Sequence, residues 1–344
     1  MTDTAGSVSI IIPAYNRKDD LLDLIGDIYR QSYSDIEIIV VDDSSTEDIS
    51  AAAGSEFPMV VFLRCSRRSG PSFARNMGIL KATGRYMLFL DTDVEITDPN
   101  MIKRMVDIMT ADSGIAELGG EMFLREGALY YQAGDIAFDG YSKNREAVYT
   151  EDNSGFFYCD FIFTSNCFIE RKKIIEIGGF DPYFVYPGED KDIGFRLKKK
   201  GYLNCCHSAA LLKHKVSPLR GCGSRYYECC RTKLRFALKN KGIFVFLMSP
   251  FADMMRELLF IPSRLKRKKT AGTQISRPKR QGGPLLPLYI RAFIWNLRNF
   301  RQTLRSRNEN FLSDRAMQEF VCYSEKEKLF RKEIFNGLKP DVVL

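Results

Sequence analysis

The chain has 344 residues, of which 45% are hydrophobic and 27% are charged. A chain of this length and composition forms one large or two modest domains, which excludes a mostly disordered chain, a collagen-like repeat and a protein with many membrane-spanning segments. The net charge of +8 is uneven, because Arg220 to Leu344 carries 27 Lys and Arg against 10 Asp and Glu while the residues before it are net acidic. This asymmetry predicts an acidic site that suits a metal ion and, in the last third, a basic surface for an anionic partner.

The first hundred residues alternate between β-like and helix-like segments. Short runs of apolar and β-branched residues predict strands, and apolar residues three or four positions apart predict helices between them. The predicted strands are Val8–Ile12, Ile36–Val41, Met59–Leu63 and Tyr86–Leu90, and the predicted helices are Asp19–Gln31, Thr46–Ala53, Gly70–Ala82 and Pro99–Met109, the last with Asp98 as its cap. This alternation predicts an α/β fold with a doubly wound, mostly parallel sheet.

The pattern is mixed from residue 115 to residue 218 and helical beyond it. In the middle segment we expect strands at Gly119–Leu124 and Phe161–Ile169 and helices at Arg171–Gly178 and Asp190–Lys200. We therefore expect residues 1–220 to form one domain and residues 221–344 to form a basic, mainly helical extension.

The extension combines apolar and basic segments. Its predicted features are a helix at Arg225–Lys239, an apolar stretch at Ile243–Pro262, a basic run at Arg264–Lys269, a linker at Thr270–Pro284 and an amphipathic helix at Leu286–Leu304. We expect Pro250 to break the apolar stretch, and its charged residues make it a poor membrane-spanning helix.

Polar clusters follow three of the predicted strands, at the point where each strand ends. These clusters are Ala14-Tyr15-Asn16, Asp42-Asp43 and Asp91-Thr92-Asp93. Because ligands bind at the carboxyl ends of parallel strands, we expect the clusters to meet in one crevice. Carboxylates in such a crevice repel each other unless a cation or hydrogen-bond donors balance them, so Asp91 and Asp93 are either a divalent metal site or a polar turn.

Six short motifs occur in a fixed order along this part of the chain. They are Ser9-Ile-Ile-Ile-Pro-Ala-Tyr-Asn16, Val40-Val-Asp-Asp-Ser-Ser45, Ala74-Arg-Asn-Met-Gly78, Phe89-Leu-Asp-Thr-Asp93, Gly178-Gly-Phe-Asp181 and Gly188-Glu-Asp-Lys-Asp192. In this order and with these gaps, the segment from about Val8 to Pro218 resembles glycosyltransferase family 2. The resemblance implies a GT-A fold and a catalytic domain in residues 1–220. It also implies transfer of a sugar from a nucleotide diphosphate donor to an acceptor hydroxyl, with inversion.

The resemblance also implies roles for individual residues. For the donor nucleotide, these are Pro13, Ala14, Tyr15, Asp43, Arg75 and Asp91, with Asn76 beside Arg75. For a divalent metal, Mn²⁺ or Mg²⁺, they are Asp93 and His214, although His214 is equally consistent with a histidine at a strand edge. For the acceptor, they are Phe180, Asp181 and Glu189. Asp190 resembles the catalytic base, with a helix cap as its alternative role.

The chemistry requires these residue types. The acceptor hydroxyl loses its proton as it attacks the anomeric carbon, so a carboxylate is needed beside it. The leaving diphosphate gains negative charge, which a cation neutralises. We expect Asp190, at a helix N-terminus, to have a low pKa. The family often has glycine after the second-strand aspartates, where this chain has Ser44 and Ser45.

The basic extension suggests where the protein acts. Basic helices with one apolar face are typical of a helix that lies on an anionic membrane, although a helical cap on the catalytic domain or a subunit interface would have the same pattern. No recognised nucleic-acid motif accompanies the charge, so we expect no nucleic-acid partner. The first residues lack a secretory signal, and the nine cysteines show no CxxC motif, so we expect a cytoplasmic location. Together with the basic extension, this predicts a protein that is peripheral on the inner face of the cell membrane.

The predicted function is therefore transfer of a sugar from a nucleotide-sugar donor to a glycan or lipid-linked acceptor in polysaccharide biosynthesis. Two alternatives stay open at this point. One is a nucleotidyltransferase on a similar fold, although such enzymes usually carry a glycine-rich basic loop where this chain has Pro13-Ala-Tyr-Asn16. The other is a catalytically inactive scaffold of the same family.

Overall fold

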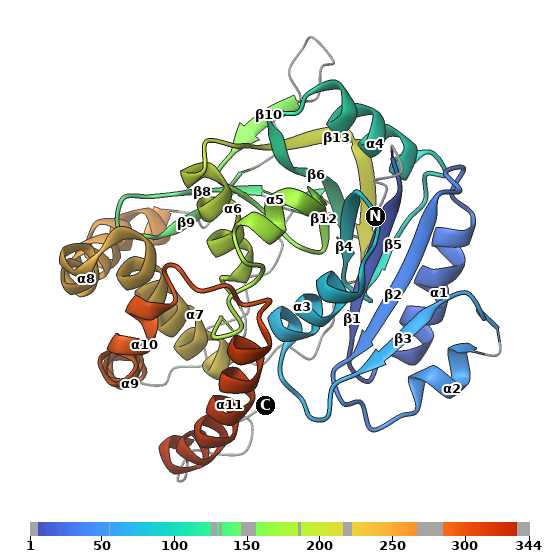
Figure 1. Cartoon of the computed structure of the whole chain (residues 1–344). Coiled ribbons are helices and arrows are strands. Elements are labelled where there is room, and N and C mark those ends of the chain that lie inside the picture. Colours follow the sequence, from blue (N-terminus) through green and yellow to red (C-terminus); the bar gives the residue numbers. More distant parts are fainter. Residues whose placement is uncertain are drawn as a thin grey trace. The chain divides into compact units, whose positions relative to one another are not determined.

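The computed structural model describes residues 6–54, 56–124, 129–130, 133–145, 156–184, 187–215, 222–266 and 285–335. The chain divides into two compact units (Figure 1). The first unit contains residues 1–135, 142–217 and 309–328, and the second contains residues 136–141, 218–308 and 329–344. The main division after residue 217 lies near the expected boundary at residue 220, but the first unit also takes residues 309–328 from the expected extension.

A ten-stranded sheet forms the centre of the first unit. Its strands are β1 (Val8–Ala14), β2 (Ile36–Asp42), β3 (Val61–Arg64), β4 (Tyr86–Leu90), β5 (Val94–Glu95), β6 (Ile115–Leu124), β7 (Leu129–Tyr130), β10 (Phe156–Cys159), β12 (Asn166–Glu170) and β13 (Leu203–His214). The order is β10-β13-β6-β12-β4-β1-β2-β3, with β5 paired to β13 and β7 to β6. The first four strands are parallel, as the alternating pattern predicted, whereas β12 runs antiparallel between β4 and β6.

Helices cover both faces of this sheet. They are α1 (Lys18–Tyr29), α2 (Ile49–Gly54), α3 (Pro71–Lys81), α4 (Met101–Ala111), α5 (Arg171–Glu176), α6 (Glu189–Lys199) and α11 (Asp314–Phe335). Successive side chains of a strand point to opposite faces, so Ile10 packs with the core that contains α1 and α4, and Ile11 packs with the core that contains α3, α5, α6 and α11. The predicted doubly wound α/β fold is therefore present (Figure 1).

Two local predictions in the first unit were wrong. The expected strand Phe161–Ile169 is two strands, because a turn separates β11 (Phe161–Ile162) from β12 and β11 joins β8 (Ala133–Ile136) and β9 (Ser142–Arg145) in a second, three-stranded sheet. The helix expected from Pro99 begins at Met101 instead. The carboxylate of Asp98 accepts a hydrogen bond from the backbone N–H of Asn100, which holds these residues in a turn before the helix.

The second unit is helical and has its own core. Its elements are α7 (Cys222–Phe236), the π-helical turn η1 (Ala237–Lys241), α8 (Ile243–Lys266), α9 (Leu285–Arg298) and α10 (Phe300–Arg305). Leu234, Leu238, Phe246 and Ala292 are buried together in this core. The expected amphipathic helix Leu286–Leu304 is divided at Asn299 between α9 and α10.

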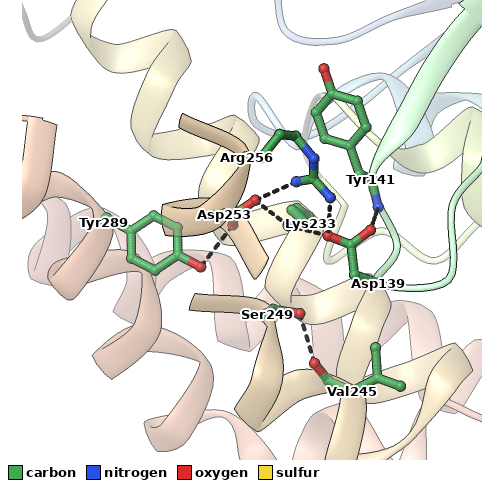
Figure 2. A network of polar contacts seen from close by, with 8 residues as sticks. All are labelled: Asp139, Tyr141, Lys233, Val245, Ser249, Asp253, Arg256 and Tyr289. Carbon is green, nitrogen blue, oxygen red and sulfur yellow. Dashed lines mark hydrogen bonds and ion pairs between the residues drawn. The ribbon is translucent and has the colours of Figure 1, made fainter. Parts of the chain in front are cut away.

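The prediction that Pro250 breaks the apolar stretch was also wrong, because α8 continues through it. Proline removes one backbone hydrogen bond from a helix, which usually costs about 3 kcal/mol. Contacts on both sides of the proline hold the helix: Phe246 is buried before it, and Asp253 and Arg256 form ion pairs after it (Figure 2). Long-range packing of this kind is not visible in a local sequence pattern.

Part of the expected basic segment lies outside the described residues. Residues 264–266 of the basic run belong to α8, and residues 267–269 and the expected linker Thr270–Pro284 are not described. In the parts of the chain that are described, no helix has both the length and the apolar character needed to cross a membrane.

Candidate active site

The first polar cluster and the second lie side by side at the carboxyl ends of β1 and β2. Ala14 ends β1 in register with Asp42, and the carbonyl oxygen of Ala14 accepts a hydrogen bond of 2.8 Å from the backbone N–H of Asp43. The ring of Tyr15 is half-buried, and the guanidinium of Arg68 lies over it, 4.0 Å from the ring centre. The structure thus brings together Pro13, Ala14, Tyr15 and Asp43, the residues expected to hold the nucleoside.

Asp43 also holds the backbone directly before α3, a role that the sequence did not reveal. Its two carboxylate oxygens accept hydrogen bonds from the backbone N–H groups of Ser69 (2.6 Å) and Gly70 (2.8 Å), directly before α3. Burial raises the pKa of Asp43 above its ordinary value, and these two N–H groups oppose the rise. Each carboxylate oxygen has a further lone pair, so this role leaves room for a hydrogen bond to a nucleotide base.

The loop after β2 contains a non-glycine residue in the left-handed region. Ser44 has φ of 65°, a conformation that glycine adopts without steric cost, which explains why glycine is common here in the family. We expect Ser44→Gly to stabilise the protein by about 0.5–1 kcal/mol, measured by denaturant unfolding.

The neighbouring Ser45→Gly is the matched control. The Ser45 hydroxyl accepts a hydrogen bond from the backbone N–H of Asn16, so its loss is expected to destabilise the protein. Equal effects of the two glycines would contradict a specific strain at Ser44.

Arg75 joins the Asp91-Thr92-Asp93 segment to the start of α6. Its Nη2 lies 2.7 Å from Oδ1 of Asp91, its Nη1 lies 3.5 Å from Oε1 of Glu189, and only 2% of its side chain is exposed. Burial lowers the pKa of Arg75, but the charges of Asp91, Glu189 and Asp190 outweigh this and raise it. The sequence placed Arg75 along the donor site; in the structure it is also the counter-charge for a cluster of acids.

Asp190 lies in the first turn of α6 and is held by Thr164, which belongs to the turn between β11 and β12. Both the backbone N–H (3.1 Å) and the hydroxyl (2.7 Å) of Thr164 donate to Oδ1 of Asp190. The expectation of a low pKa was wrong, because burial raises the pKa of Asp190 more than Arg75 and Thr164 lower it. The sequence identified the helix N-terminus but not the depth of burial.

Glu189 is buried beside Asp190, and its pKa is also raised. Burial and the charge of Asp190 raise the pKa of Glu189 to about 8, against the opposing effect of Arg75. The raised pKa favours proton uptake by Glu189, which would limit the repulsion between the two adjacent acids.

Asp93 and His214 meet because β5 pairs with the end of β13. His214 is in register with Val94, and the carbonyl oxygen of Asp93 accepts a hydrogen bond of 2.7 Å from the backbone N–H of Lys215. This places Nε2 of His214 3.7 Å from Oδ1 of Asp93, with both side chains largely buried. Arg17, which the sequence analysis missed although it directly follows the first polar cluster, lies 3.3 Å from the other oxygen of Asp93.

The pair of Asp93 and His214 fits a divalent cation that shares its ligands with a substrate. A carboxylate and a neutral imidazole, here 3.7 Å apart, are donor types that would hold such an ion. Among the described residues, no group of three or more His, Cys, Asp and Glu side chains could hold a metal.

Phe180 and Asp181, expected to face the acceptor, are buried instead. Phe180 has no exposed surface and packs edge-on against Phe89, and its backbone N–H and carbonyl are both hydrogen-bonded to the side chain of Asn76. Asp181 is 1% exposed and accepts a hydrogen bond from the backbone N–H of Tyr183. In this structure the motif therefore shapes the core behind the site, and the side chain of Phe180 packs inside the protein.

The preceding glycines explain the rest of that motif. Gly178 and Gly179 have φ of 76° and 74°, and a Cβ atom on Gly178 would lie 2.8 Å from the carbonyl oxygen of Glu309. Arg196 fixes the turn by donating to the carbonyl oxygens of Ile177 and Gly179. The family motif is therefore, in this chain, a tightly packed turn.

Comparisons with known proteins identify the family of this part of the chain. The family model described as Glycosyl transferase family 2 matches residues 9–178. The O-antigen biosynthesis protein RfbC of Myxococcus xanthus is 26% identical over 224 residues, which is 62% of this chain and 18% of RfbC. The chain spans between 13% and 52% of the length of eight curated relatives that it matches.

Two solved structures share the fold. GalNAc-T7, crystallised with UDP, GalNAc and Mn²⁺, has a TM-score of 0.57 at 17% identity, and the match covers 89% of this chain and 59% of that one. The mannosyltransferase PcManGT of Pyrobaculum calidifontis, in complex with GDP-Man and Mn²⁺, has a TM-score of 0.52 at 16% identity. This match covers 94% of this chain and 87% of that one. These likenesses confirm the predicted GT-A fold. The family match shows that residues 9–178 form a glycosyltransferase family 2 domain, and the two structures show its fold.

Proposed function

We propose that the protein is an inverting glycosyltransferase that moves a sugar from a nucleoside diphosphate donor to an acceptor hydroxyl. The observation that carries the proposal is the cluster around Arg75, which joins Asp91 of one motif to Glu189 of another across 97 intervening residues of sequence. Acids from both motifs therefore surround one guanidinium, as donor binding and base catalysis at a single site require.

For the donor, we assign the nucleoside to Pro13, Ala14, Tyr15 and Asp43, and the ribose or a metal-bound water to Asp91, which is paired with Arg75. Asp93 and His214 would hold Mn²⁺ or Mg²⁺, which, when bound, neutralises the charge that develops on the leaving diphosphate. The names of the two structural neighbours support this assignment, because both contain Mn²⁺ together with UDP or GDP-Man.

For the acceptor, we assign the base to Asp190. A new bond forms between the acceptor oxygen and the anomeric carbon, the bond from that carbon to the diphosphate breaks, and the hydroxyl proton moves to Asp190. Thr164 holds Oδ1, so we assign the proton to Oδ2. We also assign Glu189, next to this base, to the acceptor side; its raised pKa favours the protonated form, whose O–H would be a hydrogen-bond donor.

The acceptor we propose is a lipid-linked or other precursor of a cell-surface glycan. The name of the Myxococcus xanthus relative, an O-antigen biosynthesis protein, supports a role in polysaccharide assembly. A lipid-linked acceptor would place the protein at the inner face of the cell membrane, in contact with anionic lipid.

The hydroxyl of Thr164 should set the pH dependence of the reaction. Activity rises as Asp190 loses its proton, and the Thr164 hydroxyl stabilises the charged form of Asp190. Thr164→Val removes this donor, so the pKa of Asp190 rises and the acidic limb of the kcat profile moves to higher pH by about one unit. Thr164→Ser keeps a hydroxyl and should retain the original profile; an unshifted profile in the valine variant would contradict the role of Thr164.

The proposed function is tested by product release. The purified chain is incubated with a panel of nucleotide sugars, Mn²⁺ and a bacterial lipid extract, and free nucleoside diphosphate is measured. We expect release from one donor, accelerated by the extract and abolished by chelation of the metal. Absence of release from every donor would refute the proposal.

A further inference from the structure

The outward side of α8 is apolar. In the part of α8 whose side chains are described, seven large apolar residues are between 38% and 67% exposed: Ile243, Phe244, Leu247, Met248, Phe251, Met254 and Met255. Their spacing places them on one side of the helix, opposite Val245, Phe246 and Ser249, which are buried. A helix on a water-exposed surface normally has polar residues on this side.

The charged residues of the same segment point inward. Figure 2 shows Asp253 between Lys233 of α7 (2.5 Å), Tyr289 of α9 (2.9 Å) and Arg256 (2.8 Å). Arg256 in turn lies 2.5 Å from Asp139. Burial alone would raise the pKa of Asp139, but Arg256 and Lys233 lower it to about 2, so the network is ionised at neutral pH. The polar side of α8 is therefore used to attach it to its own unit.

Helix α9 repeats this arrangement. Its exposed apolar residues are Leu286, Ile290, Ile294 and Leu297, between 41% and 69% exposed, whereas Asn296 is buried and donates a hydrogen bond to the carbonyl oxygen of Arg231 on α7. The rings of Phe246 and Phe293 stack with their centres 5.0 Å apart, so α8 and α9 lie side by side. Both helices make polar contacts with α7, and we call their eleven exposed apolar residues the α8–α9 face.

Exposed arginines follow the last apolar residue of this face in the sequence. Arg298 at the end of α9 and Arg301 and Arg305 in α10 are exposed. Apolar side chains flanked by arginines complement a surface with an anionic outer layer and an apolar interior, which is the structure of an anionic lipid bilayer.

We propose that the α8–α9 face docks on an anionic membrane, with α8 and α9 lying in the plane of the interface. Phenylalanine, leucine and methionine side chains on helices that the Asp253 network holds in place would enter the headgroup region, and the arginines would contact lipid phosphates. The proposal specifies the surface for the membrane contact proposed above and rests on that contact, but it does not depend on the transfer chemistry.

The test is flotation of the full chain with vesicles, without any sugar donor. One set of vesicles contains one third phosphatidylglycerol in phosphatidylcholine, and the other contains phosphatidylcholine alone. We expect the wild type to float with the anionic vesicles, and Phe244→Glu/Phe251→Glu to reduce the bound fraction about tenfold. Arg298→Gln/Arg301→Gln/Arg305→Gln should lose the preference for anionic vesicles.

The control variant is Met59→Glu/Leu80→Glu, which alters two residues of the first unit that are 80% and 52% exposed. It should bind vesicles like the wild type, and circular dichroism confirms that every variant is folded. Equal binding by wild type and Phe244→Glu/Phe251→Glu, or no binding by the wild type at low salt, would overturn the proposal. Light scattering tests a second possibility. If the wild type is a dimer that the same two substitutions dissociate, and it does not bind vesicles, the face mediates self-association and the proposal is overturned. Nucleoside diphosphate binding is measured in a separate experiment. Its result tests the proposed donor site and does not depend on whether the protein binds vesicles.

Discussion

Replacing Asp190 with asparagine is expected to lower sugar transfer by about 10³-fold and to leave nucleoside diphosphate binding unchanged. A positioned general base contributes about 10²- to 10⁴-fold to rate, and an amide cannot accept the acceptor proton. Asparagine keeps an oxygen that can accept both hydrogen bonds from Thr164, so the position of α6 should be preserved. The two effects are measured as kcat with saturating donor and as calorimetric affinity for the diphosphate.

Asp192→Asn is the matched control for this variant. Asp192 lies in the same turn of α6, but its carboxylate pairs with Arg196 at 2.8 Å and is structural. Its loss should lower the free energy of unfolding while the folded protein keeps its kcat. If Asp190→Asn retains full turnover, or if both variants lose the same activity, Asp190 is not the base.

Replacing Arg75 with methionine is expected to destabilise the protein by about 3 kcal/mol at pH 8 and by less at pH 5. Breaking a buried ion pair leaves an uncompensated charge, which costs about 3–5 kcal/mol unless the acid takes up a proton. Arg75 opposes the rise of the pKa of Glu189 and of Asp190, so its loss raises both further. When the pKa of a carboxyl is higher in the folded state than in the unfolded state, the protein loses stability as the pH rises from the lower value to the higher one. The loss of unfolding free energy caused by Arg75→Met is therefore larger at pH 8 than at pH 5.

Two further variants distinguish this electrostatic effect from a general loss of packing. Arg75→Met/Glu189→Gln removes one of the titrating acids and should reduce the difference between pH 5 and pH 8. Arg64→Met breaks the pair with Asp42, in which the arginine side chain is 54% exposed, and should cost less than about 1 kcal/mol. Denaturant unfolding followed by circular dichroism measures all three. A deficit of Arg75→Met that is the same at both pH values would contradict the electrostatic account.

Local patterns were sufficient for most of the fold. The strand Tyr86–Leu90 has the predicted bounds, and the parallel arrangement of β1 to β4 follows from their alternation with helices. Order and spacing of the motifs also identified the family. These features depend on residues close together in the sequence, where periodicity and turn chemistry are reliable guides.

The remaining features depend on contacts between distant residues. Thr164 reaches Asp190 only because the chain turns between β11 and β12, and no motif marks that turn. A helix N-terminus lowers the pKa of a carboxylate, but the burial that raises the pKa of Asp190 comes from the whole unit. The continuity of α8 through Pro250 likewise depends on Asp253 and its partners on α7 and α9.

The roles of Asp93 and Asp190 are tested together by calorimetric titration of nucleoside diphosphates with and without Mn²⁺, using the wild type, Asp93→Ala and Asp190→Asn. We expect one diphosphate to bind the wild type and Asp190→Asn in a Mn²⁺-dependent manner. Asp93→Ala should lose that dependence, with an affinity at least about tenfold weaker. Binding that ignores both Mn²⁺ and the Asp93 substitution, or no binding of any diphosphate to the wild type, would contradict these roles.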